Sequence, residues 1–206
     1  GVESPAPHRA VLETAVMPGA RWFPGAQLNF ARQALRHADE AHAAGHPAIV
    51  FQNERLAAPV ETSWPELRRQ VGAFAARLQA AGVQPGDRVC AYLPNVPQTV
   101  VAFLACASVG AIWSVCSPDM GPVAVLDRFK QIAPKVLVAV DGQVWGGVTH
   151  DRAAVWFPGT QTAFAVTAPT ADTVEGSAAS EAARTPSSTP RSGRARSDDP
   201  TPRCTR

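Results

Sequence analysis

The stretch RVCAYL at residues 88–93 decides the fold, because it predicts a strand that two later runs repeat. Those runs are AIWSV at residues 111–115 and VLVAV at residues 136–140. Each is short and mostly apolar, which is typical of strands in a parallel sheet with helices on its faces. We expect the run at 111–115 to be covered on both faces. We expect the run at 136–140 to form an open apolar edge, because no later segment looks able to pair with it.

Helical periodicity precedes the first run. The sequence SWPE at residues 63–66 predicts a capping box, in which Ser63 accepts from the amide of Glu66 and the Glu66 side chain reaches back. Pro65 is compatible with a first helical turn, and Gly82 is expected to end the helix in the left-handed conformation. The positions expected to face inward are Trp64, Leu67, Val71, Phe74 and Leu78.

Two further helices fill the gaps between the three runs. Asn95, with Gln98 three residues later, is expected to cap the first of them, and Gly110 to stop it. Pro122 is expected to start the other and Pro134 to follow its end. The inward positions predicted from spacing are Val100, Phe103, Leu104 and Ala107 in the first and Leu126, Phe129 and Ile132 in the second.

The order strand, helix, strand, helix, strand makes two βαβ units, whose right-handed crossovers place the strands parallel. The predicted fold class is therefore α/β, as part of a doubly wound parallel sheet. Ligands of such sheets bind outside the carboxyl ends of the strands. Those ends are expected at residues 93–95, 116–119 and 141–142.

The composition changes near residue 150. From residue 156 to residue 206 only four of 51 residues, about 8%, are Val, Ile, Leu or Phe, well below the roughly 20% that a core requires. We expect an N-terminal cap segment at 1–28, a partial α/β domain at 29–152 and a disordered tail at 153–206. The tail is rich in Arg, Ser, Pro, Thr and Ala, as an out-of-frame reading of GC-rich DNA would be. We therefore hypothesise a frameshift near residue 155 rather than a basic arm for nucleic acid.

The whole chain gives little indication of a charged partner, because its net charge is +2. We find no apolar run near the length of a membrane span and no signal peptide in the first twenty residues. The cysteines, Cys90, Cys106, Cys116 and Cys204, form no C-x-x-C pair. We predict a cytoplasmic, reducing location with no disulfide, no zinc, no nucleic acid and no membrane.

Several strings resemble the adenylate-forming acyl-CoA synthetases. WFPGAQLN at 22–29 is similar to an N-terminal segment of the acetyl-CoA synthetase type, and GVQPGDRV at 82–89 to a segment that most acyl-CoA synthetases share. WSVCSPDMG at 113–121 discriminates best, because it resembles the acetoacetyl-CoA synthetase branch; the acetyl and propionyl enzymes have a loop rich in glycine and phenylalanine there. The resemblance continues through DRF at 127–129 and PKVL at 134–137, and covers about residues 17–152.

The resemblance implies a partial AMP-binding domain and a reaction that uses ATP, magnesium and CoA. Acetoacetate would attack the α-phosphate of ATP to give an acyl-adenylate and diphosphate, and the CoA thiol would then displace AMP. The family uses a loop rich in Gly, Ser and Thr around the phosphates and a C-terminal catalytic lysine. Neither is found here, since Lys130 and Lys135 are the only lysines and lie in the βαβ region. We therefore predict no catalytic and no metal-ligating residue in this chain.

The cofactor-binding candidates are Gly146 and Gly147, within WGGV at 145–148. Relatives have a short glycine loop with basic residues here, near the nucleotide end of CoA. Val148 stands where a basic residue would be expected, so a plain turn is the favoured interpretation.

Other chemically active side chains have ordinary explanations. Asp119 is expected to cap the helix that follows it. Cys116 has no basic neighbour in sequence to lower its pKa, so we expect a packed thiol. The histidines are expected on the surface without metal spacing: His8, His37, His42, His46 and His150.

Three functional hypotheses follow. The chain is a truncated acetoacetyl-CoA synthetase, inactive alone and part of a longer protein; or it is a fragment of another short-chain acyl-CoA synthetase; or it is a non-catalytic binding protein built on half of a nucleotide-binding fold. The acyl pocket would lie outside these residues, so the acid rests on the resemblance alone.

Overall fold

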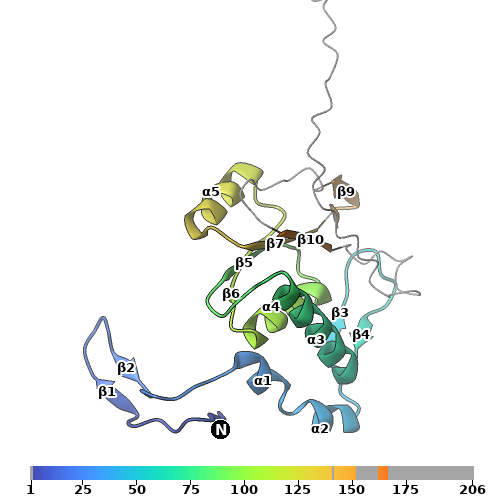
Figure 1. Ribbon diagram of the computed structural model, residues 1–206. Helices are drawn as coiled ribbons and strands as arrows, with labels where there is room; N and C mark the ends of the chain where they lie inside the picture. The colour runs from blue at the N-terminus through green and yellow to red at the C-terminus, as the bar shows by residue number, and fades with distance from the viewer. Residues whose placement is uncertain (1, 141, 152–161, 167–206) are drawn as a thin grey trace, which may run out of the picture.

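The computed structural model describes residues 2–140, 142–151 and 162–166. Its centre is a four-stranded sheet in the order β10-β7-β5-β6, in which every neighbouring pair is parallel (Figure 1). The α/β class with a parallel sheet is therefore confirmed. The strands are β5 (Arg88–Tyr92), β6 (Ile112–Cys116), β7 (Val136–Val140) and β10 (Thr162–Val166).

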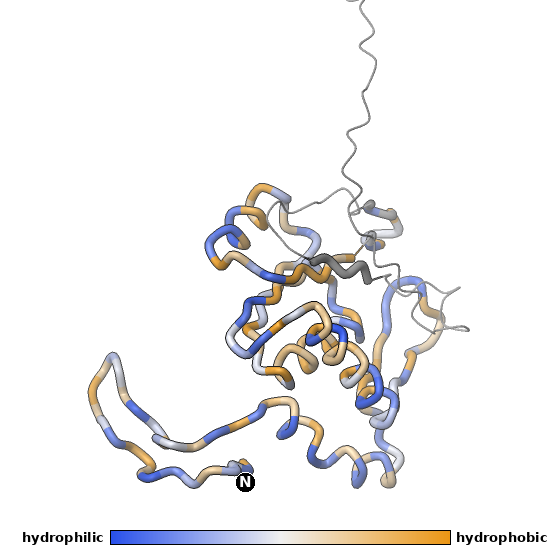
Figure 2. The backbone as a smooth tube through the Cα atoms, viewed as in Figure 1, coloured by the Kyte–Doolittle hydropathy of each residue, from blue (hydrophilic) through white to orange (hydrophobic). Residues whose placement is uncertain are grey.

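Helices cover both faces of this sheet. They are α3 (Trp64–Ala80), α4 (Pro97–Ser108) and α5 (Pro122–Ile132). Side chains alternate along β5, so that Val89 and Ala91 pack in the cluster with α3 and α4, whereas Cys90 and Tyr92 pack in the cluster with α5. Figure 2 shows the central strands as largely hydrophobic segments. The core is thus two apolar layers separated by the sheet.

The expectation of an open edge at residues 136–140 is wrong. β7 lies between β5 and β10, and its residues are buried except for Ala139, which is half-buried. The pairing with β10 runs from Thr162 opposite Val136 to Val166 opposite Val140. The expectation of disorder across 153–206 is accordingly wrong for residues 162–166. The rest of that segment, residues 153–161 and 167–206, lies outside the described residues.

The expectation that residues 111–115 are covered on both faces is also wrong. Among the described residues, β6 pairs only with β5 and forms an edge of the sheet. Ile112 and Val115 remain 54% and 47% exposed. Local sequence predicted a strand correctly here but not its position in the sheet.

The ends of α3 largely follow the prediction. Ser63 is the N-cap, and its Oγ accepts from the amide of Glu66 at 3.4 Å. The Glu66 side chain does not reach back toward the N-cap as the capping box predicts. Its carboxylate accepts instead from Arg69 and Gln70 at 2.6–2.8 Å. Gly82 follows the helix with φ +78°, the left-handed conformation expected of it.

The hydrogen bond from Arg69, and next that from Gln70, lowers the pKa of Glu66 from 4.5 to about 2. A carboxyl whose pKa is lower in the folded state stabilises the fold above its ordinary pKa and loses that contribution as pH falls toward the lowered value. We therefore expect the urea midpoint to fall between about pH 4.5 and pH 2. Glu66→Gln should flatten part of this fall, while Glu40→Gln, at an exposed carboxylate on α2 (Ala38–Ala43), should not. If the urea midpoint of Glu66→Gln fell with pH as much as that of the unsubstituted protein, the contribution assigned to Glu66 would be contradicted.

The start and the buried face of α4 differ from the prediction. The N-cap is Val96, without a side-chain cap, so Asn95 does not cap this helix. Leu104 is buried as expected, but Val100 is 37% exposed and its neighbour Val101 is buried instead. The helix is apolar on more than one side, because it packs against α3 and the sheet while the side bearing Val100 stays partly open.

Shorter elements complete the chain. Asn29 caps α1 (Phe30–Leu35) through its Oδ1, which accepts from the amide of Arg32 at 3.1 Å. The shorter elements flank residues 63–140 in sequence. They are α1 (Phe30–Leu35), α2, and the antiparallel pairs β1 (Leu12–Thr14) with β2 (Arg21–Trp22), β3 (Ile49–Phe51) with β4 (Val60–Thr62), and β8 (Gly142–Trp145) with β9 (Val148–Asp151).

Two glycines offer a matched test of the backbone. Gly110 has φ +76°, and an added Cβ would lie 3.2 Å from the Cβ of Pro85. Gly72 lies exposed inside α3, and an added Cβ meets nothing within 4 Å. We expect Gly110→Ala to destabilise the fold by about 1–2 kcal/mol and Gly72→Ala to stabilise it by about 0.5–1 kcal/mol. Urea unfolding measures both, and a gain in stability for Gly110→Ala would refute this account of the turn.

Candidate functional site

The carboxyl edge of the sheet is the candidate site. The chain goes from β5 outward to β6 on one side, then returns to β7 on the other side of β5. The reversal places the topological switch point between β5 and β7, where open α/β sheets bind ligands. The segments there are the loop after Tyr92 and the end of β7 at Val140; residue 141 lies outside the described residues.

The loop after β5 is fixed by its own backbone and by one hydroxyl. The amide of Val96 donates to the carbonyl of Pro94 at 3.0 Å, and Thr99 Oγ1 donates to the same carbonyl at 2.7 Å. Asn95 is exposed at the tip of this loop. Gln98, expected only as a capping partner, has a buried Oε1 with no hydrogen-bond partner among the described residues. A buried acceptor of this kind is a polar group that a ligand or water could satisfy.

The loop after β6 is held from β5. The hydroxyl of Tyr92 lies 2.9 Å from the carbonyl oxygen of Pro118 and 3.0 Å from that of Met120, and it is buried. Asp119 does not cap α5, because the N-cap is Gly121 without a side-chain cap. This loop therefore takes its position from Tyr92 rather than from the cap that the sequence suggested.

The thiols of the described residues are packed, as expected for Cys116. Cys90 and Cys116 belong to the same buried cluster, and Cys106 is buried on the other face. Burial, and next the neighbouring Cys116, raises the pKa of Cys90 to about 12, and burial raises that of Cys106 to about 12. Thiols with such pKa values are not nucleophiles at neutral pH.

Gly146 and Gly147 form the two-residue turn between β8 and β9, where Trp145 pairs with Val148. Their φ values are +59° and +75°, as in a hairpin turn with two left-handed residues. The amide of Gly147 donates to Glu54 Oε1 at 3.2 Å. The plain-turn interpretation thus has a direct geometric basis, while a role toward CoA stays a prediction.

Both lysines lie away from the carboxyl edge. Lys135 immediately precedes β7, at the amino end of the sheet, where its Nζ donates to Asp87 Oδ2 at 3.0 Å and to the carbonyl of Gly82. Lys130 lies exposed in the last turn of α5. The hydrogen bond from the Gln84 amide, and next that from Lys135, lowers the pKa of Asp87. Lys135 thus ties structural elements together at the end opposite the candidate site.

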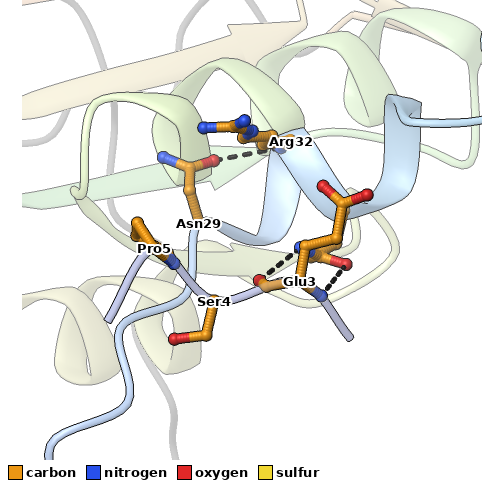
Figure 3. Close-up of a pocket in the computed structure, with 6 residues that line it drawn as sticks. Glu3, Ser4, Pro5, Asn29 and Arg32 are labelled. Atoms are coloured by element: carbon orange, nitrogen blue, oxygen red, sulfur yellow. Dashed lines mark hydrogen bonds between the residues drawn. The ribbon is translucent and has the colours of Figure 1, made fainter. Parts of the chain in front are cut away.

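A shallow cavity of about 290 Å³ lies elsewhere, between the N-terminal segment and α1 (Figure 3). Glu3 and Gln33 exchange two hydrogen bonds across it, at 2.7 and 3.1 Å. Asn29 and Arg32 also line it. The described residues contain no cluster of three metal-ligating side chains, and no helix among them is long and apolar enough to cross a membrane. Of the five histidines, His150 is half-buried and the others are exposed.

A family model for AMP-binding enzymes matches residues 35–202, and the chain therefore belongs to the AMP-binding enzyme family. Within that family it is similar to acetoacetyl-CoA synthetases, which confirms the resemblance found in the motifs. It is 43% identical over 143 residues to that of Rhizobium meliloti, a match that covers 69% of this chain and 21% of the relative. It is 46% identical over 129 residues to that of Mus musculus, covering 63% and 19%.

A solved structure shows the same similarity. The acetoacetyl-CoA synthetase from Streptomyces lividans superposes with a TM-score of 0.74 at 45% identity, over 82% of this chain and 27% of that one. The chain thus spans about a fifth of the length of the curated relatives above, at 19–21%. The family match also continues beyond residue 152, where the composition changes.

Proposed function

We propose that this chain is the N-terminal part of an acetoacetyl-CoA synthetase. The complete enzyme would use ATP to join acetoacetate to CoA, releasing AMP and diphosphate, with magnesium at the phosphates. The observation that carries this proposal is the 43–46% identity to acetoacetyl-CoA synthetases. Small molecules would be its partners, and the cytoplasm its location.

In this proposal the described residues form the support of the active site. The loops after β5 and β6, held by Thr99 and Tyr92, would form its floor at the switch point. The phosphate loop, the catalytic lysine and the acidic residues for magnesium would come from later parts of the enzyme. The turn at Gly146 and Gly147 would meet the nucleotide end of CoA only after Glu54 releases the Gly147 amide.

The organisation of the chain belongs to the same proposal. Residues 1–28 would be a cap segment, residues 29–152 together with β10 a partial AMP-binding domain, and the residues after β10 a tail altered by a frameshift. The coding DNA beyond residue 155 tests this directly. Another frame should encode a loop rich in Ser, Thr and Gly followed by Pro-Lys; its absence from every frame would count against the truncated-enzyme account.

A further inference from the structure

The N-terminal segment at residues 2–28, here called the arm, leaves its apolar side chains in solvent. Figure 1 shows the hairpin β1–β2 standing away from the sheet and its helices, and Figure 2 shows hydrophobic segments along it. Met17 is 88% exposed and Trp22 59% exposed. Several large apolar residues of the arm are exposed in the same way: Val2, Val11, Leu12, Val16, Phe23 and Leu28. A surface patch of this kind marks an interaction site.

The arm has a defined conformation although its hairpin stands off the body. The amide of Phe23 donates to the carbonyl of Val11 at 3.0 Å, and Arg21 pairs with Glu13 at 3.0 Å. At its base, Ser4 Oγ and the backbone of Gln27 exchange two hydrogen bonds at 2.8 and 3.0 Å. Two strands of three and two residues are too short to be stable in water by themselves. Such a hairpin needs a packing partner.

The charge of the arm indicates what kind of partner this is. Glu3 and Glu13 balance Arg9 and Arg21, so the arm carries two charges of each sign and no net charge. An arm that binds nucleic acid or an anionic membrane would carry an excess of Lys and Arg. The exposed apolar side chains and the balanced charge therefore favour an apolar partner surface without a strong net charge, such as another part of a protein.

A second open surface begins where the arm ends. Phe30, the first residue of α1, contacts the ring of Phe103, which in turn contacts Trp113 on β6, with centroids 5.3 and 6.4 Å apart. Among the described residues, β6 is an edge of the sheet, with Ile112 and Val115 exposed. An apolar path thus runs from the base of the arm to this edge.

We propose that the arm is a strap that packs against the later part of the same enzyme. This inference rests on the proposed function. Its occupant follows from length: the chain matches 19–21% of its curated relatives and 27% of the Streptomyces lividans enzyme, so most of such a protein is available to cover the arm. The strap would contact the later part of the enzyme on one side, and the edge strand β6 would contact it on the other.

The test compares hydrogen exchange in two proteins. One is the 206-residue chain; the other joins its residues 1–166 to the part of the Streptomyces lividans enzyme that follows the matched region. We expect the amides of residues 11–23 to exchange at least about tenfold more slowly in the joined protein. The double substitution Met17→Ser and Trp22→Ser should remove this protection, whereas Val123→Ser, at an equally exposed valine on α5, should retain it.

Several results would overturn the strap. They are equal exchange in the two proteins, protection in the 206-residue chain alone, self-association of that chain through the arm, and binding of the arm to phosphatidylcholine vesicles. If the joined protein does not fold, the intact Streptomyces lividans enzyme replaces it, and fast exchange of its corresponding segment rejects the proposal. Acetoacetate activation by the joined protein is measured separately, so the proposed function can fail while the strap stands.

Discussion

Truncation after residue 156 should turn the chain into an aggregating or unfolded polypeptide, whereas truncation after residue 166 should leave its sheet intact. The shorter chain lacks β10, which pairs with all five residues of β7. Each lost backbone hydrogen bond costs about 0.5–1.5 kcal/mol, and a domain has only about 5–15 kcal/mol of stability in total. Loss of β10 also turns Val136–Val140 into an apolar edge, which is a site for aggregation.

Size-exclusion chromatography with light scattering, paired with thermal melting, separates the two truncations. We expect the chain ending at 166 to melt cooperatively, and the chain ending at 156 to elute as aggregates or to lack a transition. Equal behaviour of both would mean that β10 contributes nothing to the sheet.

The second large effect concerns catalysis. The 206-residue chain should catalyse no ATP–pyrophosphate exchange with acetoacetate above a blank without enzyme. The transition state of adenylate formation carries negative charge around a pentacoordinate phosphorus, and enzymes stabilise this charge with amides at a helix N-terminus, cations and metal ions. The sequence holds no loop rich in Gly, Ser and Thr for this purpose, and Lys135 is bound to Asp87 at the opposite end of the sheet. Because enzymes commonly contribute at least about a millionfold, we expect a chain without these groups to show no measurable activity.

The order of elements from residue 63 to residue 140 was predictable because each signal there is local. The cap at Ser63, the left-handed Gly82 and the apolar runs of β5 and β7 act within a few residues of themselves. The double-glycine turn at Gly146 is of the same kind.

The features that the sequence did not predict depend on contacts between residues that are distant along the chain. β10 is only a moderately apolar segment, in which Phe164 and Val166 stand among Thr and Ala, and its strand character comes from pairing with β7. β6 looked like a central strand because composition does not specify which strand becomes an edge. In α4, Val100 and Val101 are equally apolar, so only the arrangement of α3 and the sheet selects Val101 for burial.

The candidate site was predictable in place but not in detail. Parallel strands bring their carboxyl ends together, so the loops at 93–95 and 116–119 were expected there, and they are. The roles of the side chains within these loops were not predictable. Asn95 and Asp119 looked like helix caps, but Tyr92 and Thr99 make the hydrogen bonds that hold the loops. Tyr92 gave no local signal, since its partners at Pro118 and Met120 are 26 and 28 residues away.

The central claim is that this chain supplies the support of an acetoacetate-activating site and not the site itself. The most direct measurement is pyrophosphate exchange by the protein that joins residues 1–166 to the later part of the Streptomyces lividans enzyme, beside the 206-residue chain. The account predicts acetoacetate-dependent exchange by the joined protein and none by the chain alone. Exchange by the 206-residue chain, or a joined protein that is folded and inactive, would contradict it.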